Sequence, residues 1–310
     1  MGVHSPEVWF GFTALIAGLL ALDLGVLNRR SHVLAFREAI GWSGGLVTIA
    51  LLFGAFLWLR EGTKPALEYY AGYVIELSLS VDNLFVFLLI FQYFAVPAEL
   101  QPRILKWGIL GALVLRGMMI GLGALLLVQF HWIIYVFGGI LVLTGIRMFR
   151  GAGDRIEPER NPLVRAARRL IPMTNAYDGQ RFLTRTRAGW MATPLLLVLL
   201  MVEWSDLVFA IDSIPAIFAV TRDPFIVYSS NVFAVLGLRA LYFVLAGMMD
   251  RFEYLKPGVA LILVFVGVKM LINGVLPVPI GVSLGVILSI LVLSVVVSMR
   301  KTRTAAREPR

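Results

Sequence analysis

The most constraining feature of this 310-residue sequence is a series of long apolar stretches that fill most of its length. A helix needs about 20 mainly apolar residues to cross a bilayer core. Membrane-spanning strands are shorter and alternate apolar with polar residues, which these stretches do not. The sequence therefore predicts an all-α polytopic membrane protein with about nine transmembrane helices, near residues 7–27, 41–59, 67–95, 107–128, 131–149, 192–220, 225–249, 258–275 and 280–299.

Composition also indicates that lipid is the solvent of this chain. It is 59% hydrophobic and 15% charged, whereas soluble domains are about 45–50% apolar and about 25% charged. The absence of cysteine excludes disulfides and thiolate metal sites. The first apolar stretch has no basic residue before it and carries Asp23, so we expect a permanent span rather than a cleaved signal peptide.

The distribution of Lys and Arg predicts the orientation of the chain. The loops on one side of the predicted spans hold three basic residues, and the loops on the other side hold 21. Because basic loops stay in the cytoplasm, we expect the N-terminus outside and the C-terminus inside. The net charge of +9 then reflects topology and contact with anionic lipid headgroups, and no nucleic-acid partner is expected.

An internal repeat relates two parts of the chain. The segment 76–83 aligns with 206–213, and both segments place two carboxylates six residues apart. The segment 140–148 aligns with 262–270. Since each copy holds three helices, the second copy must enter the bilayer inverted, as in many secondary transporters.

This repeat sets the predicted domain organisation. Two N-terminal helices occupy residues 1–60, repeat 1 covers 67–149 and repeat 2 covers 192–275. The last helix and a basic cytoplasmic tail occupy 280–310. The arginine-rich segment 150–190 is predicted as a cytoplasmic loop, in which an amphipathic piece lies on the inner leaflet or forms a solvated linker.

Polar side chains inside the predicted spans mark a candidate metal site, because charge at membrane depth is costly and persists only when paired, hydrated or protonated. Their hard oxygen donors suit Mg²⁺, Ca²⁺ or Mn²⁺ and argue against Zn²⁺ and Cu⁺. Two arginines at equivalent repeat positions, Arg116 and Arg239, are predicted to compensate the negative charge. The predicted metal residues are Glu76, Asp82, Asn83, Glu203, Asp206, Asp212 and Ser213.

Two questions about this site stay open at the level of sequence. Pro215 lacks an N–H and clashes with the carbonyl of Ile211, so it predicts a helix break beside Asp212 that exposes carbonyl oxygens to a cation. Alternatively, the carboxylates only pair with the two arginines.

The two carboxylate segments resemble the paired signatures of the TerC family. They are Glu76-Leu-Ser-Leu-Ser-Val-Asp-Asn-Leu-Phe-Val86 and Glu203-Trp-Ser-Asp-Leu-Val-Phe-Ala-Ile-Asp-Ser-Ile-Pro-Ala216. The start, with Asp23-Leu-Gly-Val-Leu-Asn28 and the His32 region, resembles the Alx-like branch. The resemblance implies a LysE-like transporter of the bacterial inner membrane that exports divalent metal, chiefly Mn²⁺.

The expected function is therefore Mn²⁺ export by alternating access, with protons as a possible coupling ion and no enzymatic activity. No nucleotide-binding Gly-x4-Gly-Lys-Ser/Thr motif is present to supply ATP hydrolysis. An intramembrane aspartyl protease needs only two opposed aspartates, which fits five carboxylates and two arginines poorly. The other alternative is a membrane scaffold that assists metalation or stress resistance of partner proteins, which the long basic loop leaves open.

Overall fold

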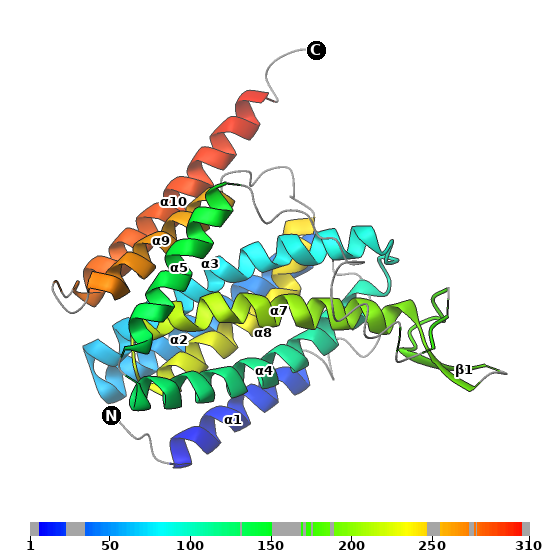
Figure 1. Cartoon of the computed structure of the whole chain (residues 1–310), viewed down its shortest axis with the longest axis horizontal. Helices are drawn as coiled ribbons and strands as arrows, with labels where there is room; N and C mark the ends of the chain where they lie inside the picture. Colours follow the sequence, from blue (N-terminus) through cyan, green and yellow to red (C-terminus); the bar gives the residue numbers. More distant parts are fainter. Residues whose placement is uncertain are drawn as a thin grey trace.

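The computed structural model is a bundle of helices with one small antiparallel hairpin (Figure 1). The part of the chain that it describes comprises residues 6–22, 35–130, 132–150, 169, 172–174, 176–186, 189–246, 255–272, 276 and 278–305. Its helices are α1 (Pro6–Leu20), α2 (Phe36–Glu61), α3 (Thr63–Tyr93), α4 (Gln101–Gln129), α5 (Ile133–Phe149), α7 (Pro194–Phe218), α8 (Pro224–Ala246), α9 (Leu255–Ile272) and α10 (Ile280–Ala305).

Each apolar stretch predicted from the sequence overlaps one of these helices. Five helices of the described part are long and apolar enough to cross a membrane, namely α2, α4, α7, α8 and α10. Three further apolar helices, α1, α5 and α9, are shorter. A helical chain with several membrane spans is therefore confirmed, while the count of nine spans and the inverted repeat stay predictions. Asp23 and His32 lie outside the described residues.

Helix α8 is the central element of the bundle. It is mainly apolar, and 83% of its most apolar window is buried inside the protein. Such helices are covered by other helices on all sides, and here α2, α3 and α4 all pack against α8. In Figure 1 α8 lies among these helices, whereas α10 extends away from the bundle beside α9.

Glycines bring α5 and α9 into backbone contact. A Cβ atom added at Gly145 would lie 2.7 Å from the carbonyl oxygen of Ala260, and one added at Gly267 would lie 2.7 Å from that of Gly138. No side chain fits at either distance. The two helices can approach this closely only because small residues occupy the interface, which is how apolar helices associate in membranes.

Aromatic side chains fill the space between α1, α2 and α8. The ring of Phe53 lies 5.0 Å from Phe233 and 5.5 Å from Phe12, measured between centroids. Phe12 in turn lies 5.4 Å from Phe225 in an edge-on arrangement. Such offset and edge-on pairs add a small attraction to the burial of apolar surface. This cluster attaches the otherwise loosely packed α1 to the bundle.

The predicted break at Pro215 is wrong. Helix α7 continues through this proline to Phe218. The reason is position: Pro215 lies in the last turn, where only the carbonyl of Ile211 loses its intrahelical donor. The next residues close the helix normally, since the amide of Ala219 donates to the carbonyl of Pro215 over 3.0 Å.

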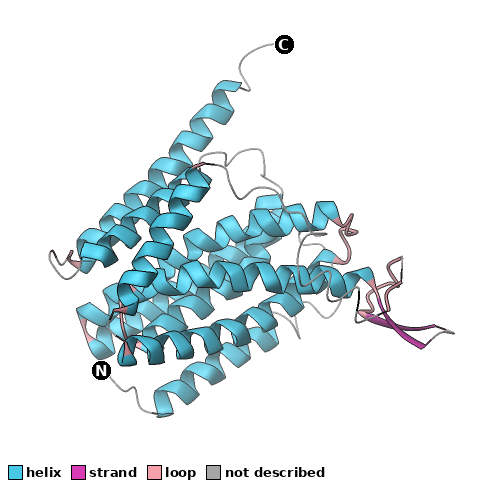
Figure 2. Cartoon of the chain, viewed as in Figure 1, coloured by secondary structure: helices cyan, strands magenta, loops and turns pink. Residues whose placement is uncertain are grey.

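The sequence did not predict the hairpin of β1 (Leu183–Thr186) and β2 (Gly189–Ala192). Figure 2 shows it in magenta beside the N-terminal end of α7. The segment before it is attached to the α3–α4 connection, because the Tyr177 hydroxyl donates to the carbonyl of Phe94 over 2.8 Å. Burial raises the pKa of Tyr177 still further above neutral pH, so this phenol remains a hydrogen-bond donor. The predicted amphipathic piece, 161–171, lies outside the described residues apart from Arg169.

The α5–α9 contact generates a stability prediction. We expect Gly145→Ala to destabilise the protein by about 1–3 kcal/mol, because the new methyl group has no room. Gly139→Ala is the matched control, since a Cβ at Gly139 in the same helix meets nothing within 4 Å. Thermal unfolding in detergent measures both variants. Equal melting temperatures for the two variants would contradict the close backbone contact.

Candidate functional site

A buried group of three charged side chains lies where α3, α4 and α7 meet. Arg116 on α4 donates from Nε to Oδ2 of Asp206 over 3.0 Å and from Nη2 to Oδ1 of Asp206 over 2.7 Å. Its Nη1 donates to Oε1 of Glu76 on α3. The three side chains are 0–2% exposed. We call this group the Arg116 triad.

The geometry of the triad explains how its charges are tolerated. The two parallel hydrogen bonds to Asp206 are the bidentate arrangement in which guanidinium and carboxylate interact most strongly. Two carboxylates face one guanidinium, so the triad carries a surplus negative charge when both acids are ionised. The second oxygen of Glu76, Oε2, is buried and has no hydrogen-bond partner among the described residues. That oxygen is a place where a proton or a further cation can bind.

Polar residues continue from Glu76 along one face of α3. Ser80 and Asn83 follow at steps of four and three residues, the spacing that returns to the same side of a helix. Both are buried, with exposed fractions of 0% and 2%. Within the described part of the chain, Ser80 Oγ and Asn83 Nδ2 have no hydrogen-bond partner. Unpaired buried polar atoms are costly, so each of these atoms is a candidate for contact with water or with a polar ligand.

Sequence reasoning missed the polar residues that α8 adds near this face. Asn231 is 1% exposed, and both atoms of its amide lack a partner among the described residues. Its neighbour Ser230 packs against α3, since a Cβ at Gly72 would lie 2.9 Å from the Ser230 hydroxyl oxygen. The sequence does contain a signal for Asn231, because an amide side chain inside an apolar span is as unusual at membrane depth as a carboxylate.

The other predicted residues occupy three further places. Glu203 lies one turn before Asp206, and its carboxylate fills the space where a side chain at Gly111 would begin. Glu203 Oε2 is buried without a partner in the described part. Arg239 is buried on α8, with 3% exposed.

Asp212 faces a different neighbour from Asp206. It accepts a hydrogen bond of 2.9 Å from the hydroxyl of Thr144 on α5. Ser213 beside it is 1% exposed, and its hydroxyl has no partner within the described residues. Six residues along a helix correspond to a rotation of about 240°, which points Asp212 away from the triad.

The structure thus divides the predicted metal residues rather than gathering them. Among the described side chains no group of three or more His, Cys, Asp or Glu could hold a metal ion. Asp82 lies in α3 six residues after Glu76, and its side chain is outside the described set. Glu76 and Asp206 both form ion pairs with Arg116, while the role of these residues in metal binding stays a prediction.

Sequence comparison places these features in a known group of proteins. Residues 61–306 match the TerC family of integral membrane proteins. No solved structure matches the chain significantly.

Related chains match over nearly their whole length. An uncharacterized membrane protein of Myxococcus xanthus is 52% identical over 303 residues, which cover 98% of this chain and 95% of the relative. A protein of Escherichia coli K12, named as a proposed membrane-bound redox modulator, Alx, is 49% identical over 305 residues, 96% of this chain and 95% of its own. An uncharacterized membrane protein of Rickettsia felis is 40% identical over 291 residues, with 94% and 97% covered.

The Arg116 triad generates a second stability prediction. We expect Arg116→Met to destabilise the protein by about 3–5 kcal/mol, because it leaves two buried carboxylates without their counter-charge. The exposed Arg222→Met should have little effect. Denaturant unfolding in detergent gives both values.

Removing all three charges together tests the cause of that loss. The triple variant Glu76→Gln, Arg116→Met and Asp206→Asn should recover at least half of the lost stability, since no buried charge is then left unpaired. If Arg116→Met were as stable as Arg222→Met, the triad would contribute nothing and the prediction would fail.

Proposed function

Because this chain belongs to the TerC family, we propose that it transports a divalent metal cation through the membrane, with Mn²⁺ as cargo exported from the bacterial cytoplasm. The observation that supports this most is the Arg116 triad, a cation held between two buried carboxylates near the middle of long helices. The proposed orientation has the N-terminus outside and the C-terminus in the cytoplasm. As a transporter, the protein catalyses no covalent reaction.

Arg116 serves in this proposal as a tethered substitute for the metal. When Mn²⁺ enters, the guanidinium leaves the carboxylates of Glu76 and Asp206, and the ion binds to their oxygens. Ser80 Oγ and the side-chain oxygen of Asn83, which follow Glu76 on the same face of α3, would add hard donors of the kind that Mn²⁺ prefers. When the ion departs, Arg116 returns, so the carboxylates do not stay buried as uncompensated anions.

Charge balance connects this exchange to protons. With Arg116 and Asp206 charged, the empty triad is neutral when Glu76 carries a proton on Oε2, which has no partner among the described residues. Binding of a divalent ion to this carboxylate releases the proton. Because Arg116 keeps its positive charge, loading with Mn²⁺ then adds one net charge, so transport should respond to the membrane potential as well as to the pH gradient.

The packing of α5 on α9 supports the inverted repeat that alternating access requires. A Cβ at Gly145 would meet Val264, and one at Gly267 would meet Val142. In the repeat alignment Gly145 corresponds to Gly267, and Val142 corresponds to Val264. The two contacts are therefore the same contact made from each copy, as expected for two helices related by a pseudo-two-fold axis.

The names of the relatives suggest a redox role, which we place second. The chain contains no cysteine, so it cannot exchange a thiol with a disulfide. A redox effect of this protein would have to come from the ion that it moves or from a partner that it assists. The scaffold that helps to metalate partner proteins remains the alternative, with the hairpin segment as its available surface.

Mn²⁺ flux into proteoliposomes under an imposed pH gradient tests the proposal. The wild type should move Mn²⁺ in proportion to the gradient, and Asp206→Asn and Asp82→Asn should each lose at least about tenfold, because a charged hydrogen-bonding ligand is removed without a change in size. Ca²⁺ and Mg²⁺ in competition establish the selectivity.

The control for these variants is Glu99→Gln, an exposed carboxylate in the α3–α4 connection that should transport normally. Far-ultraviolet circular dichroism and gel filtration in detergent establish that each variant is folded. A folded wild type that moves none of Mn²⁺, Ca²⁺ and Mg²⁺ would overturn the transporter and leave the scaffold as the better function.

A further inference from the structure

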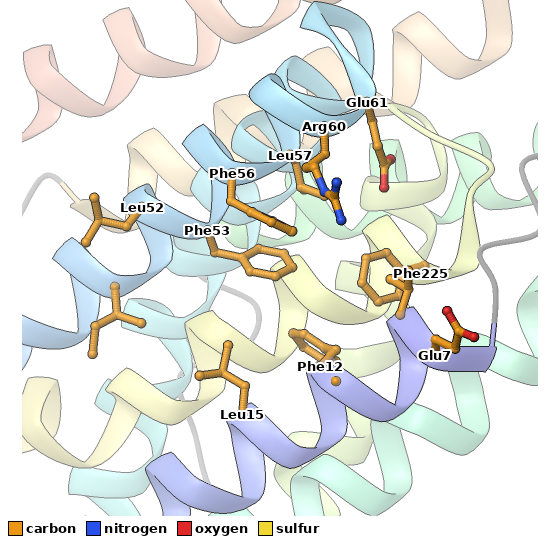
Figure 3. Close-up of a pocket in the computed structure, with 13 residues that line it drawn as sticks. Glu7, Phe12, Leu15, Leu52, Phe53, Phe56, Leu57, Arg60, Glu61 and Phe225 are labelled. Carbon is orange, nitrogen blue, oxygen red and sulfur yellow. The ribbon is translucent and has the colours of Figure 1, made fainter.

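A deep groove opens between α1 and α2, away from the Arg116 triad (Figure 3). Its volume is about 600 Å³, which lies within the range of about 300–1,000 Å³ typical of small-molecule sites. Buried and half-buried aromatic side chains form its floor, and exposed leucines form its rim. The floor consists of Phe12, Phe53 and Phe225, and the rim includes Leu15 and Leu52.

The groove runs along the helices for most of the depth of one leaflet. Eight residues separate Glu7 from Leu15 on α1, and eight separate Leu52 from Arg60 on α2. At a rise of 1.5 Å per residue, each wall is about 12 Å long. One leaflet contributes about half of a hydrocarbon core that is about 30 Å thick. The apolar part of the groove therefore has the length of the upper part of an acyl chain.

Charged residues of both signs stand at one end of this groove. Glu7 comes from the first turn of α1, and Arg60 and Glu61 come from the last turn of α2. The Arg60 guanidinium lies 5.9 Å from the centre of the Phe56 ring, which holds it at the groove. Figure 3 shows all three polar ends directed toward the same end of the groove.

We propose that this groove binds phosphatidylethanolamine. An acyl chain lies over Phe12 and Phe53, and Arg60 donates hydrogen bonds to the lipid phosphate. The carboxylates of Glu7 and Glu61 accept hydrogen bonds from the primary ammonium group.

Charge complementarity selects this lipid among common headgroups. Arginine binds phosphate through paired donors, and carboxylates bind an ammonium group that still carries N–H bonds. The quaternary ammonium of phosphatidylcholine has no N–H to donate. Phosphatidylglycerol has no cation, so its headgroup would meet two carboxylates without compensation. The groove therefore discriminates by headgroup while it accepts any acyl chain of ordinary length.

Native mass spectrometry of the delipidated full-length protein tests the site with palmitoyl-oleoyl lipids of the three headgroups. The wild type should retain phosphatidylethanolamine in preference to the other two. Arg60→Gln should reduce the bound fraction about tenfold, the effect of one lost charge-assisted hydrogen bond. Gly11→Phe should abolish binding, because position 11 lines the groove and a Cβ there points into open space.

Matched controls separate the groove from the general lipid surface. Gly18→Phe lies on the same helix with open space at its Cβ and does not line the groove, so it should bind normally. Arg222→Gln removes an exposed arginine elsewhere and should also bind normally. Should Gly11→Phe misfold, Arg60→Gln against Arg222→Gln still decides the question. Equal binding of the three headgroups, or unchanged binding in Arg60→Gln, would overturn the proposal. So would a wild-type dimer that Gly11→Phe dissociates, which would assign the groove to a second copy.

Discussion

The guanidinium of Arg116 is the group on which the centre of this bundle depends. It joins three helices through charged side chains that are almost completely buried, and none of these charges could remain there without the others. Its bidentate contact with Asp206 also fixes the rotation of α7 relative to α4, because the two planar groups must be coplanar to form both bonds. A purely apolar interface would leave that rotation less specified.

The close packing around the triad follows from small residues at a few positions. Gly111 leaves room for the Glu203 carboxylate, and Gly145 and Gly267 let α5 and α9 touch through their backbones. In lipid, apolar helices gain little from excluding water, so close contact and polar pairing must hold them together. The bundle uses both means: polar pairing joins α3, α4 and α7, and glycine contacts join α5 and α9.

Two polar regions of different character result from this arrangement. The interior region holds buried polar atoms of Ser80, Asn83 and Asn231 that have no hydrogen-bond partner among the described residues, and the Arg116 triad adds a second carboxylate. The groove between α1 and α2 is apolar along its length and charged only at one end, which suits an amphipathic molecule. The first lies where α3, α4 and α7 meet and the second lies between α1 and α2, so the proposed ion site and the proposed lipid site occupy separate parts of the chain.

Much of this architecture can be predicted from the chain alone, because lipid requires every spanning backbone to satisfy its own hydrogen bonds and helices do so locally. The helices and the interior position of Glu76, Asp206 and Arg116 follow from long apolar stretches that hold a few charges. The sequence does not predict which side chains contact one another, because those contacts depend on the rotation and depth of neighbouring helices. Only the packed bundle shows that Arg116 joins α4 to α3 and α7, that Asp212 turns to Thr144, that α7 continues through Pro215, and that Asn231 is buried.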